Sequence, residues 1–210
     1  VVVGNNHNYL LSEVEVMGRG GLVPYHKVQP TVEGKKYALA GGNWTLQRAS
    51  EVAATGENIS KADYDVSNWV VATVPGTVLT SYKNIGAVPN PNYADNIFQI
   101  SESFFNSNFW YRNEFDLPAD FKQERLFLNL DGINWKANIY LNGNKIGRME
   151  GAFIRGMYDI TDIAVEGKNV LAIEIEKNAH IGAIKEKYEV NTDFNGGILG
   201  ADNPTFHASI

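Results

Sequence analysis

The fold is decided by the stretch KANIYLNG at residues 136–143. Its alternate residues Ala137, Ile139 and Leu141 share one face, which is the period-two pattern of a half-buried strand. The closing Asn-Gly pair supplies two residues that tolerate the positive φ angles of a tight hairpin turn. The stretch therefore predicts an antiparallel β-hairpin whose second strand begins directly after the turn.

Other parts of the chain repeat this alternation. Each is expected to bury one face, and the predicted strands are residues 109–115, 126–130, 157–162 and 169–176. Helical signal is weak: Thr77 can cap a short helix over residues 78–83, and Gly86 is placed to end it. Many short strands separated by turns predict an all-β fold, an antiparallel β-sandwich with one or two short helical turns.

A chain of 210 residues with 44% hydrophobic residues is long enough to bury a sizeable core. Residues 1–40 are rich in glycine, proline and polar residues, which predicts an extended segment that packs on the sandwich. Residues 41–210 are predicted to form the sandwich domain, and within them residues 179–210 favour loops. The sequence thus predicts one main domain.

Composition and charge exclude several classes of function. The net charge of −6 is scattered, without the basic cluster that binds nucleic acid. No apolar run approaches the roughly 20 residues that span a bilayer. The chain has no cysteine, and its histidines lack the spacing of a metal site, so no metal and no cofactor is expected. These histidines are His7, His26, His180 and His207.

Eight motifs occur in an order that resembles the N-terminal sugar-binding domain of glycoside hydrolase family 2. They are GNWTLQ (42–47), YDVSNW (64–69), VPGT (74–77), NPNYADN (90–96), FWYR (109–112), LDGINW (130–135), LNG (141–143) and YDIT (158–161). The resemblance covers about residues 42–178 and implies a jelly-roll sandwich of the galactose-binding type. NPNYADN, DGINW and the closing NPTFHASI are most similar to the branch of exo-β-D-glucosaminidases and β-mannosidases.

The resemblance also implies where catalysis takes place. A retaining glycosidase needs two carboxylates about 5 to 5.5 Å apart, and in this family both belong to a downstream (β/α)₈ barrel. The partners implied are that barrel, an immunoglobulin-like domain of the same polypeptide and a carbohydrate substrate, in a secreted or periplasmic enzyme. Within the chain no pair is expected among the strand carboxylates, so the chain alone is predicted to be inactive. These carboxylates are Glu102, Glu114, Asp131 and Asp159.

The loop at residues 89–96 is the main candidate for substrate contacts. Asp95 and Asn96 offer the polar groups that sugar hydroxyls require, and Tyr93 would shape the pocket wall. The alternative is an Asx-turn loop that serves only its own backbone. A second set of candidates lies near the end of the chain and comprises Asp202, Asn203 and His207.

Exposed aromatic rings could also stack on sugars, and Trp44, Trp69, Trp110 and Trp135 are the tryptophans to consider. Core packing is expected for most of them, in particular for Trp110 and Trp135 beside strands. Three functions remain open. The first is the non-catalytic domain of an exo-β-D-glucosaminidase, placed ahead of a β-mannosidase or other family 2 enzyme. The others are a free-standing carbohydrate-binding module and a purely structural sandwich.

Overall fold

The computed structural model describes residues 32–33, 36–41, 43–119, 125–151, 153–177 and 210. Most of the regular structure consists of short strands. The strands are β1 (Val32–Glu33), β2 (Lys36–Tyr37), β3 (Trp44–Arg48), β4 (Val70–Val71), β5 (Phe109–Leu117), β6 (Phe127–Leu130), β7 (Lys136–Leu141), β8 (Asn144–Glu150), β9 (Gly156–Asp159) and β10 (Gly167–Ile175). The helices are α1 (Gly56–Ile59), α2 (Val78–Asn84) and α3 (Glu102–Phe105), with 3₁₀ turns η1 (Ala49–Glu51) and η2 (Asn96–Gln99).

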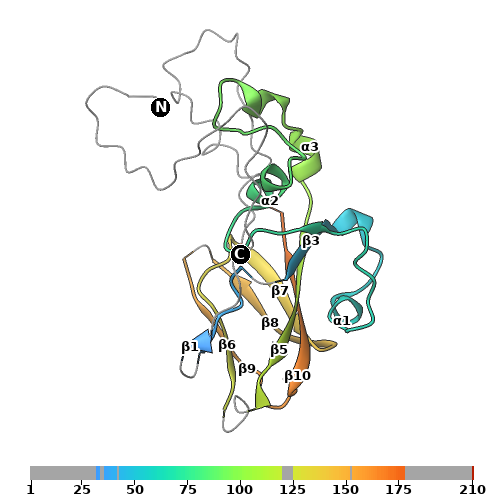
Figure 1. The fold of residues 1–210 in the computed structure, drawn as a ribbon, viewed down its shortest axis with the longest axis vertical. Helices are drawn as coiled ribbons and strands as arrows, with labels where there is room; N and C mark the ends of the chain where they lie inside the picture. Colours follow the sequence, from blue (N-terminus) through green and yellow to red (C-terminus); the bar gives the residue numbers. More distant parts are fainter. Residues whose placement is uncertain (1–31, 34–35, 42, 120–124, 152, 178–209) are drawn as a thin grey trace, which may run out of the picture.

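The strands form two layers. Six of them make an antiparallel sheet in the order β4-β3-β5-β10-β7-β8, and β6 pairs with β9 in a smaller sheet. Figure 1 shows β6 and β9 facing β5 and β10 across the core. Leu128 of the small sheet and Tyr111, Ile139 and Ile173 of the large sheet belong to one buried apolar cluster. The predicted all-β sandwich is confirmed.

The hairpin predicted from residues 136–143 is present. Ala137, Ile139 and Leu141 are buried in the core, and β7 pairs with β8 across the turn. Asn142 and Gly143 have φ angles of 49° and 83°, as this turn requires. The other predicted strands are confirmed within a few residues of their expected bounds.

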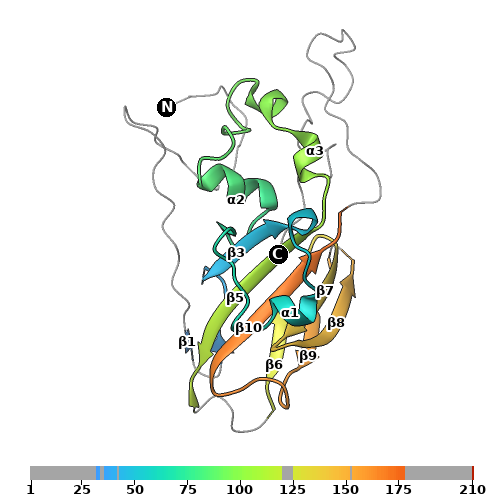
Figure 2. The same ribbon diagram turned by 90° about the vertical axis from the view of Figure 1, so that its right-hand side faces the viewer.

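The second face of the large sheet is covered by the segment at residues 49–69, with α1 lying across β10 and β7 (Figure 2). Trp69 of this segment packs with Trp110 and Tyr140 in a second apolar cluster. Gly56 brings α1 so close to the sheet that a Cβ there would lie 2.4 Å from the Tyr140 ring. The expectation that β5 is half-buried is therefore wrong: its residues are buried on both faces for most of its length.

A buried arginine fixes this covering segment. Arg112 of β5 is 2% exposed, and its guanidinium donates hydrogen bonds to the carbonyl oxygens of Ile59 and Lys61, both at 2.9 Å. It also pairs with Glu114 at 2.7 Å. A buried cation without such partners would be very costly, so the segment and the arginine depend on each other.

The predicted short helix is also confirmed. The Thr77 hydroxyl accepts a hydrogen bond from the Thr80 amide at 3.0 Å, α2 follows directly, and Gly86 has a φ of 76° beyond its end. Of residues 1–40, the structure describes residues 32–33 and 36–40, in which β1 pairs with β2 in antiparallel fashion; the others and residues 178–209 lie outside the described residues. Among the described residues, no helix combines the length and the apolar character needed to cross a bilayer.

Candidate functional site

The candidate loop at residues 89–96 lies between α2 and η2, beyond the ends of the sheet strands (Figure 2). An aromatic cluster ties α2 to α3: the ring of Tyr82 lies 5.0 Å from that of Phe104 and 5.7 Å from that of Phe105. Ile97 and Ile100 are buried directly after the loop. The loop is thus anchored to the core on both sides.

Hydrogen bonds within the loop set its shape. The side-chain oxygen of Asn90 accepts from the Asn92 amide at 3.0 Å, which is an Asx turn. The side chain of Asn96 donates to the Asn90 carbonyl oxygen at 2.9 Å and accepts from Gln99 at 3.4 Å. The Asx-turn interpretation is therefore correct for Asn90, and Asn96 uses one of the two N–H groups of its side chain to hold the loop.

An open pocket of about 380 Å³ lies against this loop. It is lined by residues 86–90, Tyr93 and Asn96, so its wall is mostly apolar, with amide groups at two positions. Tyr93 is 63% exposed. An apolar wall with a few polar groups can accept the C–H face and the hydroxyls of a sugar ring.

The site residues predicted from the sequence differ in whether they line this pocket. Tyr93 and Asn96 meet at the pocket, whereas Asp95 is half-buried between them and is not part of the lining. Asp202, Asn203 and His207 lie outside the described residues. The pocket wall at residues 86–88 was not anticipated, because nothing in those apolar residues distinguishes a pocket wall from a turn.

Three of the four predicted strand carboxylates pair with an arginine, whereas Glu102 begins α3 instead of lying in a strand. Glu114 pairs with Arg112, Asp131 with Arg155 at 3.4 Å, and Asp159 with Arg125 at 2.5 Å. Partial burial would raise the pKa of Glu114, but the hydrogen bond and charge of Arg112 lower it overall. Hydrogen bonds from Thr161 and Arg125 lower the pKa of Asp159 to about 2. A general acid needs the opposite shift, so neither of these two groups is suited to that role.

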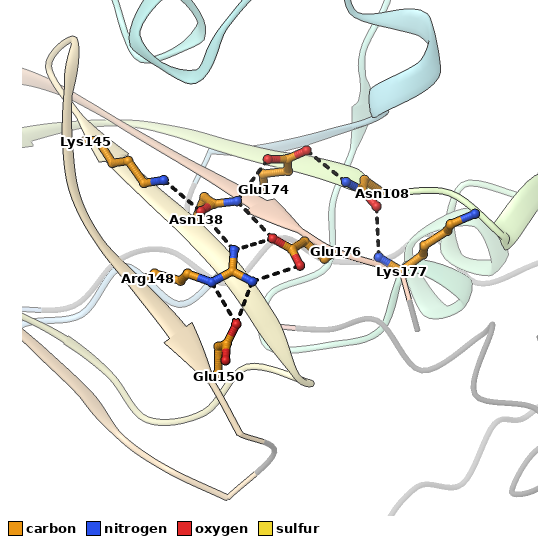
Figure 3. A network of polar contacts seen from close by, with 8 residues as sticks. All are labelled: Asn108, Asn138, Lys145, Arg148, Glu150, Glu174, Glu176 and Lys177. Carbon is orange, nitrogen blue, oxygen red and sulfur yellow. Dashed lines mark hydrogen bonds and ion pairs between the residues drawn. The ribbon is translucent and has the colours of Figure 1, made fainter. Parts of the chain in front are cut away.

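One pair of carboxylates was not identified from the sequence. Glu174 and Glu176 occupy alternate positions at the end of β10, and both accept a hydrogen bond from the side-chain amide of Asn138 at 3.2 Å (Figure 3). The sequence feature that could have identified this pair is the Glu-Ile-Glu alternation at residues 174–176, which puts both side chains on one face of the strand.

Arg148 determines the electrostatic surroundings of this pair. Its guanidinium bridges Glu176 and Glu150, and its hydrogen bond lowers the pKa of Glu176 (Figure 3). Acid and base roles require environments that separate two pKa values and keep one group protonated. The cluster is therefore an ion-pair network across β7, β8 and β10.

The tryptophans are mostly structural. Trp44, Trp69 and Trp110 are at most 9% exposed, which leaves no free face for a sugar and confirms core packing for Trp110. The same expectation is wrong for Trp135, which is only half-buried and belongs to neither apolar cluster; the Lys136 ammonium lies 4.6 Å from its ring centre. Its place in the loop before β7, beyond the end of the sheet, explains why adjacency to a strand did not bury it.

No group of three or more His, Asp or Glu side chains in the described part of the chain is arranged to hold a metal ion. All four histidines lie outside that part. Within the described residues, the candidate site is thus an apolar pocket with a tyrosine and amide groups.

Sequence comparison finds relatives of this chain among known proteins. Mannosylglycoprotein endo-β-mannosidase of Lilium longiflorum is 32% identical over 159 residues, 71% of this chain and 16% of that protein. An exo-β-D-glucosaminidase of Streptomyces avermitilis is 30% identical over 148 residues, 69% of this chain and 16% of that protein. The chain therefore spans about a sixth of the length of these relatives.

The fold matches solved structures as well. The exo-chitosanase of Amycolatopsis orientalis superposes with a TM-score of 0.59 at 24% identity, over 63% of this chain and 16% of that one. The family model described as the glycosyl hydrolase 2 galactose-binding domain-like domain matches residues 44–204. The chain belongs to this family of glycosyl hydrolase 2 domains.

Proposed function

We propose that this chain is the non-catalytic N-terminal domain of a retaining, exo-acting glycoside hydrolase. Its role is to buttress a catalytic barrel and to contribute the loop at residues 89–96 to the pocket for a terminal sugar. The observation that carries this is the convergence of the Tyr93 ring and the Asn96 amide on one open, mostly apolar pocket. A pyranose offers an apolar face and hydroxyls, and this lining suits both.

The distribution of carboxylates supports a non-catalytic role. Glu114, Asp131, Asp159 and Glu176 are each paired with an arginine. The relatives are about six times longer than the matched part of the chain, which leaves room in them for a barrel of roughly 200 residues or more. We place exo-β-D-glucosaminidase ahead of β-mannosidase, because four further relatives of this chain carry the former name.

Hydrolysis of p-nitrophenyl β-D-glucosaminide and β-D-mannoside tests the proposal. The 210-residue chain should cleave neither substrate, whereas the protein from the complete reading frame should cleave one and thereby identify the sugar. Turnover by the chain alone would contradict the non-catalytic role.

The contribution of the loop is tested in the full-length enzyme with Tyr93→Ala. Loss of the ring from the pocket wall should lower kcat/KM about tenfold, equivalent to about 1.4 kcal/mol of transition-state binding. Thermal stability should stay unchanged, because Tyr93 is 63% exposed. Asp95→Ala should lower kcat/KM less than Tyr93→Ala does, because Asp95 lies in the loop but is not part of the pocket lining.

Phe98→Ala is the matched control. Phe98 is an exposed aromatic residue of η2 that does not line the pocket, so its removal should leave kcat/KM unaltered. Equal losses in the Tyr93 and Phe98 variants would mean that the region matters only for folding or domain contact.

A free-standing carbohydrate-binding module is the second candidate, and the exposed ring of Tyr93 favours it. It differs from the first in one measurable property: the 210-residue chain would bind glucosamine or mannose oligosaccharides alone, and Tyr93→Ala would abolish that binding. Calorimetric titration of the chain with both sugars separates the two candidates.

A further inference from the structure

The turn between β7 and β8 places an asparagine directly before a glycine, at Asn142 and Gly143. Such a pair is prone to spontaneous deamidation, because glycine has no side chain to shield its backbone nitrogen. That nitrogen attacks the side-chain Cγ of the asparagine: a new C–N bond forms, the Cγ–Nδ2 bond breaks, and the proton of the glycine nitrogen leaves with ammonia. Water then opens the succinimide ring to aspartate or isoaspartate.

Hydrogen bonds hold both ends of the Asn142 side-chain amide. Its Nδ2 donates to the carbonyl oxygen of Ile163 at 3.1 Å and to the side-chain oxygen of Asn169 at 2.8 Å. Its Oδ1 accepts from the Val170 amide at 2.9 Å. The attack turns the planar Cγ into a tetrahedral centre and releases Nδ2, so these three directional bonds oppose it.

The attacking nitrogen is engaged as well. The Gly143 amide donates a hydrogen bond to the Oγ of Ser60 at 3.0 Å. Ser60 directly follows α1 and is 0% exposed. The Gly143 nitrogen must give up its proton to become a nucleophile, and a hydrogen bond to a buried hydroxyl shields that proton from base in the solvent.

We propose that Asn142 is a deamidation site that the fold keeps unreactive and that is modified only when the turn between β7 and β8 opens. Four hydrogen bonds stand against the reaction. Each should slow it about fivefold, which together makes deamidation several hundredfold slower in the folded protein than in the unfolded chain.

The modification prevents the turn from closing again. A carboxylate at position 142 has no hydrogen to donate to the Ile163 carbonyl oxygen or to the Asn169 side-chain oxygen, and its charge lies against both. Isoaspartate also lengthens the backbone, which a two-residue turn between paired strands does not accommodate. Deamidation therefore makes a transient opening of this turn permanent.

Peptide mapping by mass spectrometry, on the protein from the complete reading frame, tests the proposal. In mildly alkaline buffer Asn142 should keep its amide in the folded protein and lose it several hundredfold faster in urea. The second Asn-Gly pair of the chain, at residues 195–196, is the internal standard in urea, where both asparagines should react at similar rates. Equal rates for Asn142 with and without urea, or no reaction in urea, overturn the proposal.

Ser60→Ala isolates the hydrogen bond to Gly143. It should raise the rate in the folded protein about fivefold and leave the rate in urea unchanged. Ser67→Ala is the matched control, because Ser67 is exposed in the same covering segment and its side chain bonds to Asp65; it should change neither rate. Rates are measured well below the thermal midpoint of each variant, and an unchanged rate in folded Ser60→Ala rejects the shielding by Ser60.

Asn142→Asp reproduces one product of the reaction. It should lower the thermal midpoint by about 3 to 8 °C, because the lost donors leave the Ile163 carbonyl oxygen beside a charge. Asn144→Asp in the same turn is the control: Asn144 is exposed, so its midpoint should shift by less than about 1 °C. Equal midpoints for both variants and the wild type would show that the fold tolerates the product, and would overturn the permanence of the change.

Discussion

The two ends of the sandwich differ in the surroundings of their side chains. At one end the connection before β10 is closed by Asn169, which is 0% exposed and donates to the carbonyl oxygens of Val165 and Gly167 at 2.7 and 2.8 Å. Its oxygen accepts from the Val165 amide and from the side chain of Asn142. At the other end, Tyr93 and Phe153 project into solvent.

This difference assigns the first end of the sandwich to folding and the second end to function. At the first end, which we call the closed end, the side chains of Asn169 and Asn142 bond to nearby backbone groups and to each other. The second, open end exposes apolar rings whose burial would be favourable, and the fold itself does not use them. Substitutions at the closed end should therefore change the stability of the fold, and substitutions at the open end should change binding or docking.

The largest effect on stability is expected for Asn169→Ala. The change removes one buried amide together with its hydrogen bonds to the Val165 amide, to two carbonyl oxygens and to the Asn142 side chain, which should cost about 3 kcal/mol. A domain of this size should lose about 6 to 12 °C of thermal midpoint. Chemical unfolding of the 210-residue chain measures the loss.

Asn144→Ala is the control within the same end. Asn144 is exposed and its side chain donates only to the Asn142 carbonyl oxygen among the described residues, so the loss should stay below about 1 kcal/mol. Similar losses for both variants would show that burial of Asn169 is not what closes this end.

A smaller effect is expected at the open end from Asn96→Ala. The Asn96 side chain holds the candidate loop through the Asn90 carbonyl oxygen, a bond worth about 1 kcal/mol. Hydrogen exchange should accelerate at residues 89–96 and stay unchanged at the closed end. Asn92→Ala should change neither, because only the backbone amide of Asn92 bonds to Asn90; acceleration in both variants would contradict the role given to Asn96.

Local chemistry made much of the fold predictable. The Asn-Gly pair, the alternation in β7 and the Thr77 cap act within a few residues, and the structure confirms all three. The covering of β5 on its second face was not predictable in this way. It depends on Trp69 meeting Trp110 and on Arg112 bonding to Ile59, contacts between residues more than 40 positions apart.

The candidate site follows the same rule. Tyr93 and Asn96 lie three residues apart in one turn-rich segment, so their convergence was within reach of sequence reasoning. The network of Glu174, Asn138 and Arg148 was not, because it requires the register that places Asn138 opposite Arg148 on one side and Glu174 on the other. Cross-strand partners depend on strand order, which alternation alone does not specify.

The smallest effect concerns a charge near the closed end, in Asp159→Asn. Hydrogen bonds from Thr161 and Arg125 lower the pKa of Asp159 to about 2, from an ordinary value of 3.8. A lowered pKa in the folded state means that the carboxylate stabilises the fold above about pH 4 and that this contribution is lost as the pH falls towards 2. Asp159→Asn should therefore lower the thermal midpoint by about one or two degrees at pH 5.

The gap between the wild type and the Asp159→Asn variant should close as the pH is lowered from 4 to 2, when the wild-type carboxylate takes up its proton. Asp131→Asn provides the matched change at the open end, where both members of the ion pair with Arg155 are largely exposed; it should leave the midpoint unaltered at every pH. A gap for Asp159→Asn that persists unchanged to pH 2 would assign the effect to altered hydrogen bonding rather than to charge. An equal gap for Asp131→Asn would remove the distinction between the two ends, because the charges at both would then serve the fold alike.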